Sequence, residues 1–186
     1  MREVIKLGLI LLLITSVAAF VLGITNDITQ GVINARLEAE NIKSIEALLP
    51  EADEFIMVEG VEGDIIVEVY EGFANGNVVG YTIKTTPNGY NGTVEVLVGV
   101  TKAGEIVGVK IGQNTETPGL GTKIADAAYI NQYIGKDITQ EFVVTKDNPT
   151  EDQQIQAVTS ATVSSNAVVS GVNSAGSLFN DKLKNR

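Results

Sequence analysis

Residues 93–111 read TVEVLVGVTKAGEIVGVKI, a run in which valines recur at every second position before a short break. This period of two is typical of a β-strand with one buried face. Lys102, Ala103 and Gly104 form the break and favour a tight turn, after which β-branched residues resume. The run therefore predicts two antiparallel strands, 93–100 and 105–111, joined by a short turn.

Similar strand patterns lie on the N-terminal side, over residues 55–58, 64–70 and 78–85, and turns rich in Asn and Gly separate them. Because the connections are short, the predicted sheet is mostly antiparallel. On the C-terminal side we expect a short strand at 142–145 and a helix at 122–134. The helix would bury Ile124, Ala127, Ala128 and Ile134.

The last part of the chain has the most regular helical pattern. Its apolar residues recur at spacings of three and four, and basic residues follow them at the C-terminal end. We expect the buried face to consist of Val168, Val172, Ala175, Leu178 and Phe179. Together these patterns predict an α+β fold, in which helices flank a mostly antiparallel sheet.

Residues 7–24 (LGLILLLITSVAAFVLGI) carry no charged side chain, and twelve of them are Leu, Ile, Val or Phe. As a helix this segment would rise about 27 Å, close to the hydrocarbon thickness of a bilayer. Ser16, Val17 and Ala18 also form a small-x-small site, so a cleaved signal peptide is the alternative. The apolar pattern continues past that site, which favours a retained single-span anchor.

Arg2 and Lys6 precede the apolar segment, so the positive-inside rule predicts a cytoplasmic N-terminus and a main domain outside the inner or plasma membrane. Residues 25–49 continue at helical period, and Pro50 ends the pattern. We therefore expect an anchor at 1–24, a stalk helix at 25–50 that docks on the domain, and an extracytoplasmic domain at 51–186. Acidic residues dominate 38–71, which favours a solvated face held off anionic lipid; a cation site is the alternative.

The composition excludes several kinds of chemistry. The 186 residues include no Cys and no His, which removes disulfides, thiolate nucleophiles, Ser-His-Asp triads and the usual haem and zinc sites. The net charge of −10 argues against nucleic-acid binding, which needs clustered Lys and Arg. Redox chemistry would therefore require a bound organic cofactor or a carboxylate-ligated ion. We identify no catalytic residue and no metal-binding motif.

Two segments suggest chemistry, and the first is TSATVSS at residues 159–165, immediately before the last helix. Small hydroxyl residues at that place are ordinary N-caps. The start of a helix also binds phosphate, because unpaired N–H groups and the positive end of the helix dipole lie there. The residues alone leave both interpretations open.

The second segment is ETPGLG at residues 116–121, between a predicted strand and a predicted helix. Pro118 and Gly119 favour a turn, and an ordinary strand-to-helix connection needs nothing more. The same glycines would also let the backbone approach a flat ring, with Leu120 as an apolar contact. Here too, both interpretations stay open.

These segments carry a resemblance to a known family. SATVSS at 160–165 resembles the Ser/Thr-Gly-Ala-Thr-x-Thr/Ser flavinylation signature of membrane-anchored FMN-binding proteins, and ETPGLG looks like a segment of one branch of them. That branch is the G subunit of the Rnf (Rsx) complex, an ion-pumping ferredoxin:NAD oxidoreductase. Residues 90–111 are similar to the family too, and the likeness spans roughly residues 1–180 with the anchor included.

The resemblance implies covalently bound FMN, with the Thr162 hydroxyl as the attachment point of a phosphoester. A flavin transferase that uses FAD and a divalent metal would install it. Ser164 and Ser165 would cap the helix or hold phosphate oxygens. The other residues implied to lie near the cofactor are Thr159, Ser160, Ala161, Glu116, Thr117, Gly119, Leu120 and Gly121. Three positions depart from the family pattern: Ser160 replaces a common Gly, Gln156 a common Asp, and Asn114 a frequent His.

The implied function is an electron relay within a membrane complex, in which this subunit is not catalytic alone. Its implied partners are the other membrane subunits, the flavin transferase and membrane lipid. The ion path would belong to other subunits, because one anchor helix without internal charges cannot form it. Two alternatives stay open. One is the C subunit of a sodium-pumping NADH:quinone reductase, which shares the flavinylated threonine, and the other is a non-redox binding domain in which Thr162 only caps the helix.

Overall fold

The structure is a computed structural model that describes residues 1–61 and 63–186. The chain divides into two units, 1–42 and 43–186. The first helix, α1, runs from Arg2 to Leu48 as one continuous element and so includes both the predicted anchor and the predicted stalk helix. By length and composition it is able to cross a membrane. The predicted three-part division of the chain stays a prediction.

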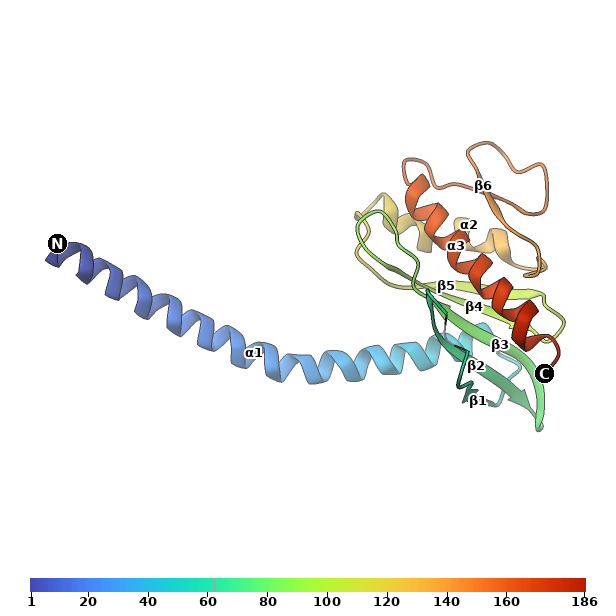
Figure 1. Cartoon of the computed structure of the whole chain (residues 1–186), viewed down its shortest axis with the longest axis horizontal. Coiled ribbons are helices and arrows are strands. Elements are labelled where there is room, and N and C mark those ends of the chain that lie inside the picture. Colours follow the sequence, from blue (N-terminus) through green and yellow to red (C-terminus); the bar gives the residue numbers. More distant parts are fainter. Residues whose placement is uncertain (62) are drawn as a thin grey trace. The chain divides into compact units, whose positions relative to one another are not determined.

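Residues 43–186 contain a five-stranded sheet whose strand order follows the sequence (Figure 1). Every neighbouring pair is antiparallel, which confirms the predicted α+β class with its antiparallel sheet. The strands are β1 (Glu54–Met57), β2 (Ile66–Ala74), β3 (Asn77–Thr85), β4 (Val94–Thr101) and β5 (Ile106–Asn114). Strand β2 extends four residues past its predicted end, because only Asn75 and Gly76 separate it from β3, and β5 extends three residues past its predicted end.

Strand β4 lies in the middle of the core and differs from the prediction in one respect. Its alternating valines lie in the main hydrophobic cluster, as expected. The opposite face is buried too, because Leu97 packs against Ile45 and Leu48 from the end of α1. The prediction of a strand with one buried face is therefore wrong, since Leu97 and the glycine at position 99 occupy a second, smaller interface.

Helix α3 (Thr162–Leu178) covers the valine face of the sheet, and Figure 1 shows it lying over the strands. A π-helical turn, Phe179–Leu183, continues it. Phe179 makes an edge-to-face contact with Tyr81 of β3, with ring centroids 6.1 Å apart. The predicted buried face is confirmed, since all five of its residues are at most 6% exposed: Val168, Val172, Ala175, Leu178 and Phe179.

The end of α1 packs on the other face of the sheet through Leu48 and Leu49. Four adjacent strands each present a glycine under these two side chains, and a Cβ on any of them would lie within 3.3 Å of Leu48 or Leu49. Glycine therefore lets the helix end approach the sheet backbone closely. The four glycines are Gly72, Gly80, Gly99 and Gly108.

The prediction of one helix over 122–134 is wrong. The segment forms three short pieces: a 3-10 turn at Gly121–Ala125, helix α2 at Ala127–Ile130, and a second 3-10 turn at Asn131–Tyr133. Asp126 interrupts the helix because its backbone is extended, with φ −68° and ψ 141°. The buried face changes accordingly: Ile124 is buried as predicted, Ala127, Ala128 and Ile134 are exposed, and Tyr129 and Tyr133 are buried instead.

The predicted strand at 142–145 is confirmed as β6 (Val143–Thr145). It pairs in parallel with β7 (Gln154–Gln156), a strand that the sequence analysis did not predict. Three residues give too little alternation for recognition from sequence. This small ribbon carries the chain to the TSATVSS segment, because β7 ends only three residues before Thr159.

Candidate functional site

The TSATVSS segment forms the entrance to α3. Ser160 has a left-handed backbone with φ +66°, Ala161 is the N-cap residue, and Thr162 is the first helical residue. No side chain caps the helix, so the interpretation of this segment as an ordinary hydroxyl N-cap does not hold. The amides of the first turn are therefore available to an anion.

The hydroxyls of the segment differ sharply in access. Thr159 and Ser160 are exposed and Thr162 is half-buried, whereas Ser164 and Ser165 are 2% and 0% exposed. The Thr162 hydroxyl enters none of the hydrogen bonds between the residues that the structure describes. Thr162 is thus an accessible hydroxyl on the first turn of α3, and the two serines after it are enclosed in the protein.

Ser165 ties the start of α3 to the neighbouring segments. Its Oγ donates to the Ala161 carbonyl and accepts from the Val158 amide, each at 3.0 Å. Its own carbonyl accepts from the Tyr129 hydroxyl at 3.0 Å. Burial raises the pKa of Tyr129 to about 12, although its hydrogen bonds to Tyr133 and Ser165 act in the opposite direction. Tyr129 therefore keeps its proton, and can donate to Ser165, at any physiological pH.

The ETPGLG segment forms a tight loop after β5. Gly119 has a positive φ of +76°, and its amide donates to the Thr122 hydroxyl at 3.0 Å. The amide of Leu120 donates to the Thr117 carbonyl at 3.1 Å, while the Leu120 side chain is 46% exposed. The loop therefore has a fixed backbone and presents an apolar side chain to solvent.

Glu116 brings the two segments together although 48 positions separate it from Ser164. The residue is 4% exposed, and its Oε2 accepts a hydrogen bond from Ser164 Oγ at 2.8 Å. Its Oε1 accepts from the amides of Tyr90 at 2.7 Å and Asn91 at 3.4 Å. Asn114 stands where the resemblance implies a frequent His, and its side-chain Oδ1 accepts a hydrogen bond from the Glu116 backbone amide at 3.3 Å. The predicted site segments are thus neighbours in space.

Tyr90 belongs to this site but was missed from the sequence. Its amide bonds to Glu116, and its side chain is 72% exposed. A signal was present, because Tyr90 is an aromatic residue in a turn of Asn and Gly at 88–92 (NGYNG), and such turns lie at the protein surface. An exposed aromatic side chain beside a buried, hydrogen-bonded loop is typical of a binding surface.

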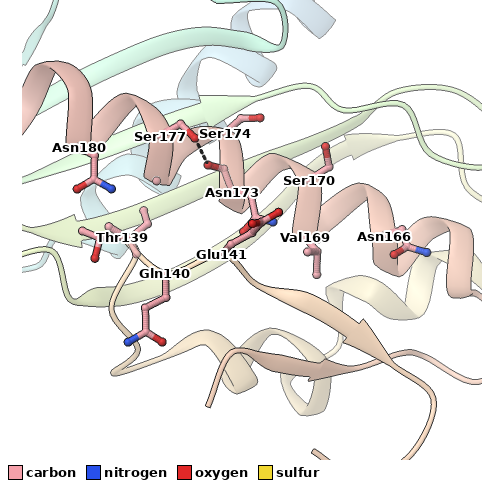
Figure 2. Close-up of a pocket in the computed structure, with 12 residues that line it drawn as sticks. Thr139, Gln140, Glu141, Asn166, Val169, Ser170, Asn173, Ser174, Ser177 and Asn180 are labelled. Atoms are coloured by element: carbon pink, nitrogen blue, oxygen red, sulfur yellow. Dashed lines mark hydrogen bonds between the residues drawn. The ribbon is translucent and has the colours of Figure 1, made fainter. Parts of the chain in front are cut away.

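Two grooves lie near the site. One has a volume of about 290 Å³ and includes Thr159 together with Lys123, Tyr129 and Gln156 among its lining residues. A second groove, of about 510 Å³, runs along α3, and Figure 2 shows Asn and Ser side chains along its α3 side. It begins at Asn166, one helical turn after Thr162. Its floor is already hydrogen-bonded, since the Asn173 side chain pairs with both backbone groups of Phe142 at 2.9 Å.

Comparison with known proteins agrees with this geometry. Residues 89–177, which include every candidate site residue, match the FMN-binding domain family. The chain is 40% identical to the G subunit of the Na(+)-translocating ferredoxin:NAD(+) oxidoreductase complex of Acetobacterium woodii, over 98% of this chain and 95% of that protein. It is 30% identical to the G subunit of the ion-translocating oxidoreductase complex of Methanosarcina acetivorans, over 94% and 93% of the two chains.

Solved structures agree on the fold. The C subunit of the Na(+)-translocating NADH-quinone reductase from Parabacteroides distasonis superposes with a TM-score of 0.56 at 19% identity, covering 69% of this chain and 76% of that one. The fold and the matched residues define a protein with an FMN-binding domain. Within that class, the chain belongs to the family of G subunits of ion-translocating oxidoreductase complexes.

Proposed function

We propose that this chain is a membrane-anchored subunit that carries FMN on Thr162 and relays electrons within an ion-translocating ferredoxin:NAD oxidoreductase complex. The observation that carries the proposal is the contrast among hydroxyls: Thr162 is accessible on the first turn of α3, whereas Ser164 and Ser165 are buried and hydrogen-bonded. A transferase can reach the first of these and not the other two.

The residues at the start of α3 fit a phosphate group. Without a side-chain cap, the amides of the first turn can bind phosphate oxygens, and the positive end of the helix dipole favours the anion. This dipole stabilisation is about 0.3–1 kcal/mol, and up to about 2 when partly buried, so it would hold a nucleotide only weakly. A covalent bond to Thr162 removes that weakness.

The loops beside Glu116 fit a flat ring. Tyr90 and Leu120 are exposed, and the backbone next to each is tied to the Glu116 carboxylate or packed against it. We assign these two side chains as apolar contacts to the isoalloxazine ring. When bound, FMN supplies the electron transfer, since flavins exchange one or two electrons. The chain fixes the phosphate, orients the ring and excludes water from one side of it.

The attachment step balances with FAD as the donor. The Thr162 oxygen would attack the phosphorus on the FMN side of the FAD pyrophosphate, form a P–O bond and displace AMP, while the hydroxyl proton leaves. The protein gains the mass of FMN less one water. The flavin transferase that supplies FAD and a divalent metal is the partner for maturation, and the other membrane subunits are the partners for turnover.

The predicted topology agrees with this role. The apolar segment 7–24 anchors the chain in the lipid of the inner or plasma membrane, Arg2 and Lys6 hold the N-terminus in the cytoplasm, and the flavin domain lies outside. A covalent tether suits that compartment, because free flavin is scarce there and a dissociable cofactor would be lost. The uncharged anchor leaves ion transport to other subunits.

The test is co-expression of the full chain with a flavin transferase. Wild-type protein should fluoresce in a denaturing gel and show the added mass, and Thr162→Ala should lose both. Ser170→Ala is the matched control, because it removes an exposed hydroxyl from the same helix. Covalent flavin on Thr162→Ala would refute the attachment site, and wild type without flavin would support the non-redox binding domain.

The C subunit of a quinone-linked enzyme is the second candidate, since structures of such subunits share the fold. The chain resembles them at only 16–19% identity, against 30–40% for the G subunits. Membranes that contain this protein should therefore reduce NAD with ferredoxin. If the same membranes instead reduce quinone with NADH, that result would favour the quinone-linked interpretation.

A further inference from the structure

Glu116 has surroundings unlike those of a residue that only lines a cofactor site. Its carboxylate is almost fully buried and accepts hydrogen bonds from Ser164 Oγ, the Tyr90 amide and the Asn91 amide. Within the described residues it forms no ion pair with Lys or Arg. Burying a carboxylate without a cation is costly, and the three hydrogen bonds offset that cost only if all of them form.

The space around the carboxylate is closed by two glycines. A Cβ on Gly89 would overlap Oε1, and a Cβ on Gly121 would overlap Oε2. The backbone at Gly89 and Gly121 therefore packs directly against the two carboxylate oxygens, and only glycine leaves room for this contact. Two further hydrogen bonds connect the turn at Gly89 to the residue before Glu116. The Asn91 side-chain amide donates to the Thr115 carbonyl at 2.7 Å, and the Thr115 hydroxyl donates to the Asn91 carbonyl at 2.5 Å.

The three donors come from two different parts of the fold. Tyr90 and Asn91 lie in the turn between β3 and β4, and Ser164 lies in the first turn of α3, two residues after Thr162. Glu116 itself leads into the ETPGLG loop. One carboxylate thus connects the turn that bears Tyr90, the loop that bears Leu120 and the helix start that bears Thr162.

We propose that Glu116 is a positioning residue: its buried carboxylate fixes the first turn of α3 against the Tyr90 turn, and its negative charge beside the flavin lowers the reduction potential. This inference rests on the proposed function, because the positioned atom is the Thr162 oxygen. Glu116 does not touch the reacting atoms, and it acts through Ser164 on one side and through the Tyr90 and Asn91 amides on the other.

Two variants separate the parts of this role. Ser164→Ala removes the connection to α3 and leaves the two amide bonds intact. Glu116→Gln keeps the shape and removes the negative charge. Ser177→Ala is the matched control, because it deletes a hydrogen-bonded hydroxyl on the same helix, where Ser177 Oγ donates to the Asn173 carbonyl at 3.1 Å, away from Glu116.

The experiment uses the full chain in detergent with limiting flavin transferase. Ser164→Ala should lower the initial rate of FMN incorporation about tenfold, because the Thr162 turn loses a hydrogen bond to a charged group. The Glu116→Gln protein, once loaded, should have a more positive midpoint potential than wild type in spectroelectrochemistry, since one negative charge no longer opposes the added electron. Ser177→Ala should match wild type in both measurements.

A measurement without flavin keeps the inference independent of the attachment site. In unloaded protein, hydrogen exchange of amides 165–168, which begin with the Ser165 amide bonded to the Ala161 carbonyl, should quicken in Ser164→Ala and not in Ser177→Ala, while the Tyr90 amide stays protected. This result is expected even if the wild-type protein accepts no flavin. That outcome would refute the proposed function and leave the positioning role of Glu116 standing. If these amides exchange at the wild-type rate in Ser164→Ala, the positioning role is refuted. If loaded Glu116→Gln has the wild-type midpoint potential, the role of the Glu116 charge is refuted.

Discussion

Leu48 lies against Gly99 so closely that a Cβ on the glycine would stand 2.9 Å from the Cβ of Leu48 and 2.6 Å from its carbonyl oxygen. The contact joins the last residue of α1 to the middle of β4, the strand with both faces buried. Leu48 is 7% exposed, so this end of the helix is part of the folded domain. The glycine at 99 is therefore a packing requirement of that junction.

We predict that Gly99→Ala destabilises the domain by about 1–3 kcal/mol, because the added methyl group must displace the helix end or the strand. Leu48→Ala should cost about 2–5 kcal/mol through the cavity that it leaves. Chemical unfolding of the full chain, followed by the circular dichroism of the sheet, measures both. Ile42→Ala, at a position 52% exposed on the same helix, is the control, and an equal loss there would contradict the junction.

Ser160→Gly should raise stability by up to about 1 kcal/mol. A left-handed residue other than glycine costs about 1–2 kcal/mol, and the greater freedom of glycine in the unfolded chain cancels part of the gain. A glycine at this position would adopt the same φ of +66° without that cost. Ser160→Val is the opposing variant and should lower stability. A stabilised Ser160→Val would show that the turn before α3 does not require this conformation.

The sequence alone could predict the sheet, α3 and the two site segments, because each has a local pattern. The valines of β4 alternate, the apolar residues of α3 recur at helical spacing, and both segments are short motifs. The break at Asp126 was not predictable in this way, since no Pro or Gly marks it. Tertiary burial of Tyr129 and Tyr133 outweighed the helical pattern of 122–134 there.

The contact between Glu116 and Ser164 also lay beyond the sequence. Each residue belongs to a predicted site segment, yet nothing local indicates that a buried hydrogen bond joins them across 48 positions. The glycines at 89 and 121 were visible only as turn residues, whereas in the fold they leave room for a carboxylate. Which polar residues meet over such a distance depends on how the strands and α3 are arranged in space, and no local pattern in the sequence gives that arrangement.

Alkaline pH should destabilise the fold through Tyr129. Its folded pKa of about 12 lies above the ordinary value of 10, so the folded state binds more protons between these limits and stability falls as pH rises through them. The loss should reach roughly 2–3 kcal/mol by pH 12, and burial also raises the pKa of Tyr133. Unfolding curves at pH 8 to 12 measure this. Tyr129→Phe should flatten the decline, Tyr90→Phe should not, and parallel curves for all three proteins would exclude this cause.

Tyr90 provides the sharpest test of where the flavin ring lies. Because its side chain is 72% exposed, Tyr90→Ala should change stability by no more than about 0.5 kcal/mol. If the ring stacks on Tyr90, the tyrosine quenches flavin fluorescence in the folded protein, and the alanine variant should be brighter. The ratio of native to denatured fluorescence, measured on equally loaded proteins, isolates that effect from the extent of attachment. Tyr90→Phe keeps the aromatic face but is harder to oxidise, so its ratio should fall between the other two. An unchanged ratio in Tyr90→Ala would place the ring elsewhere, for example along the α3 groove that begins one turn after Thr162.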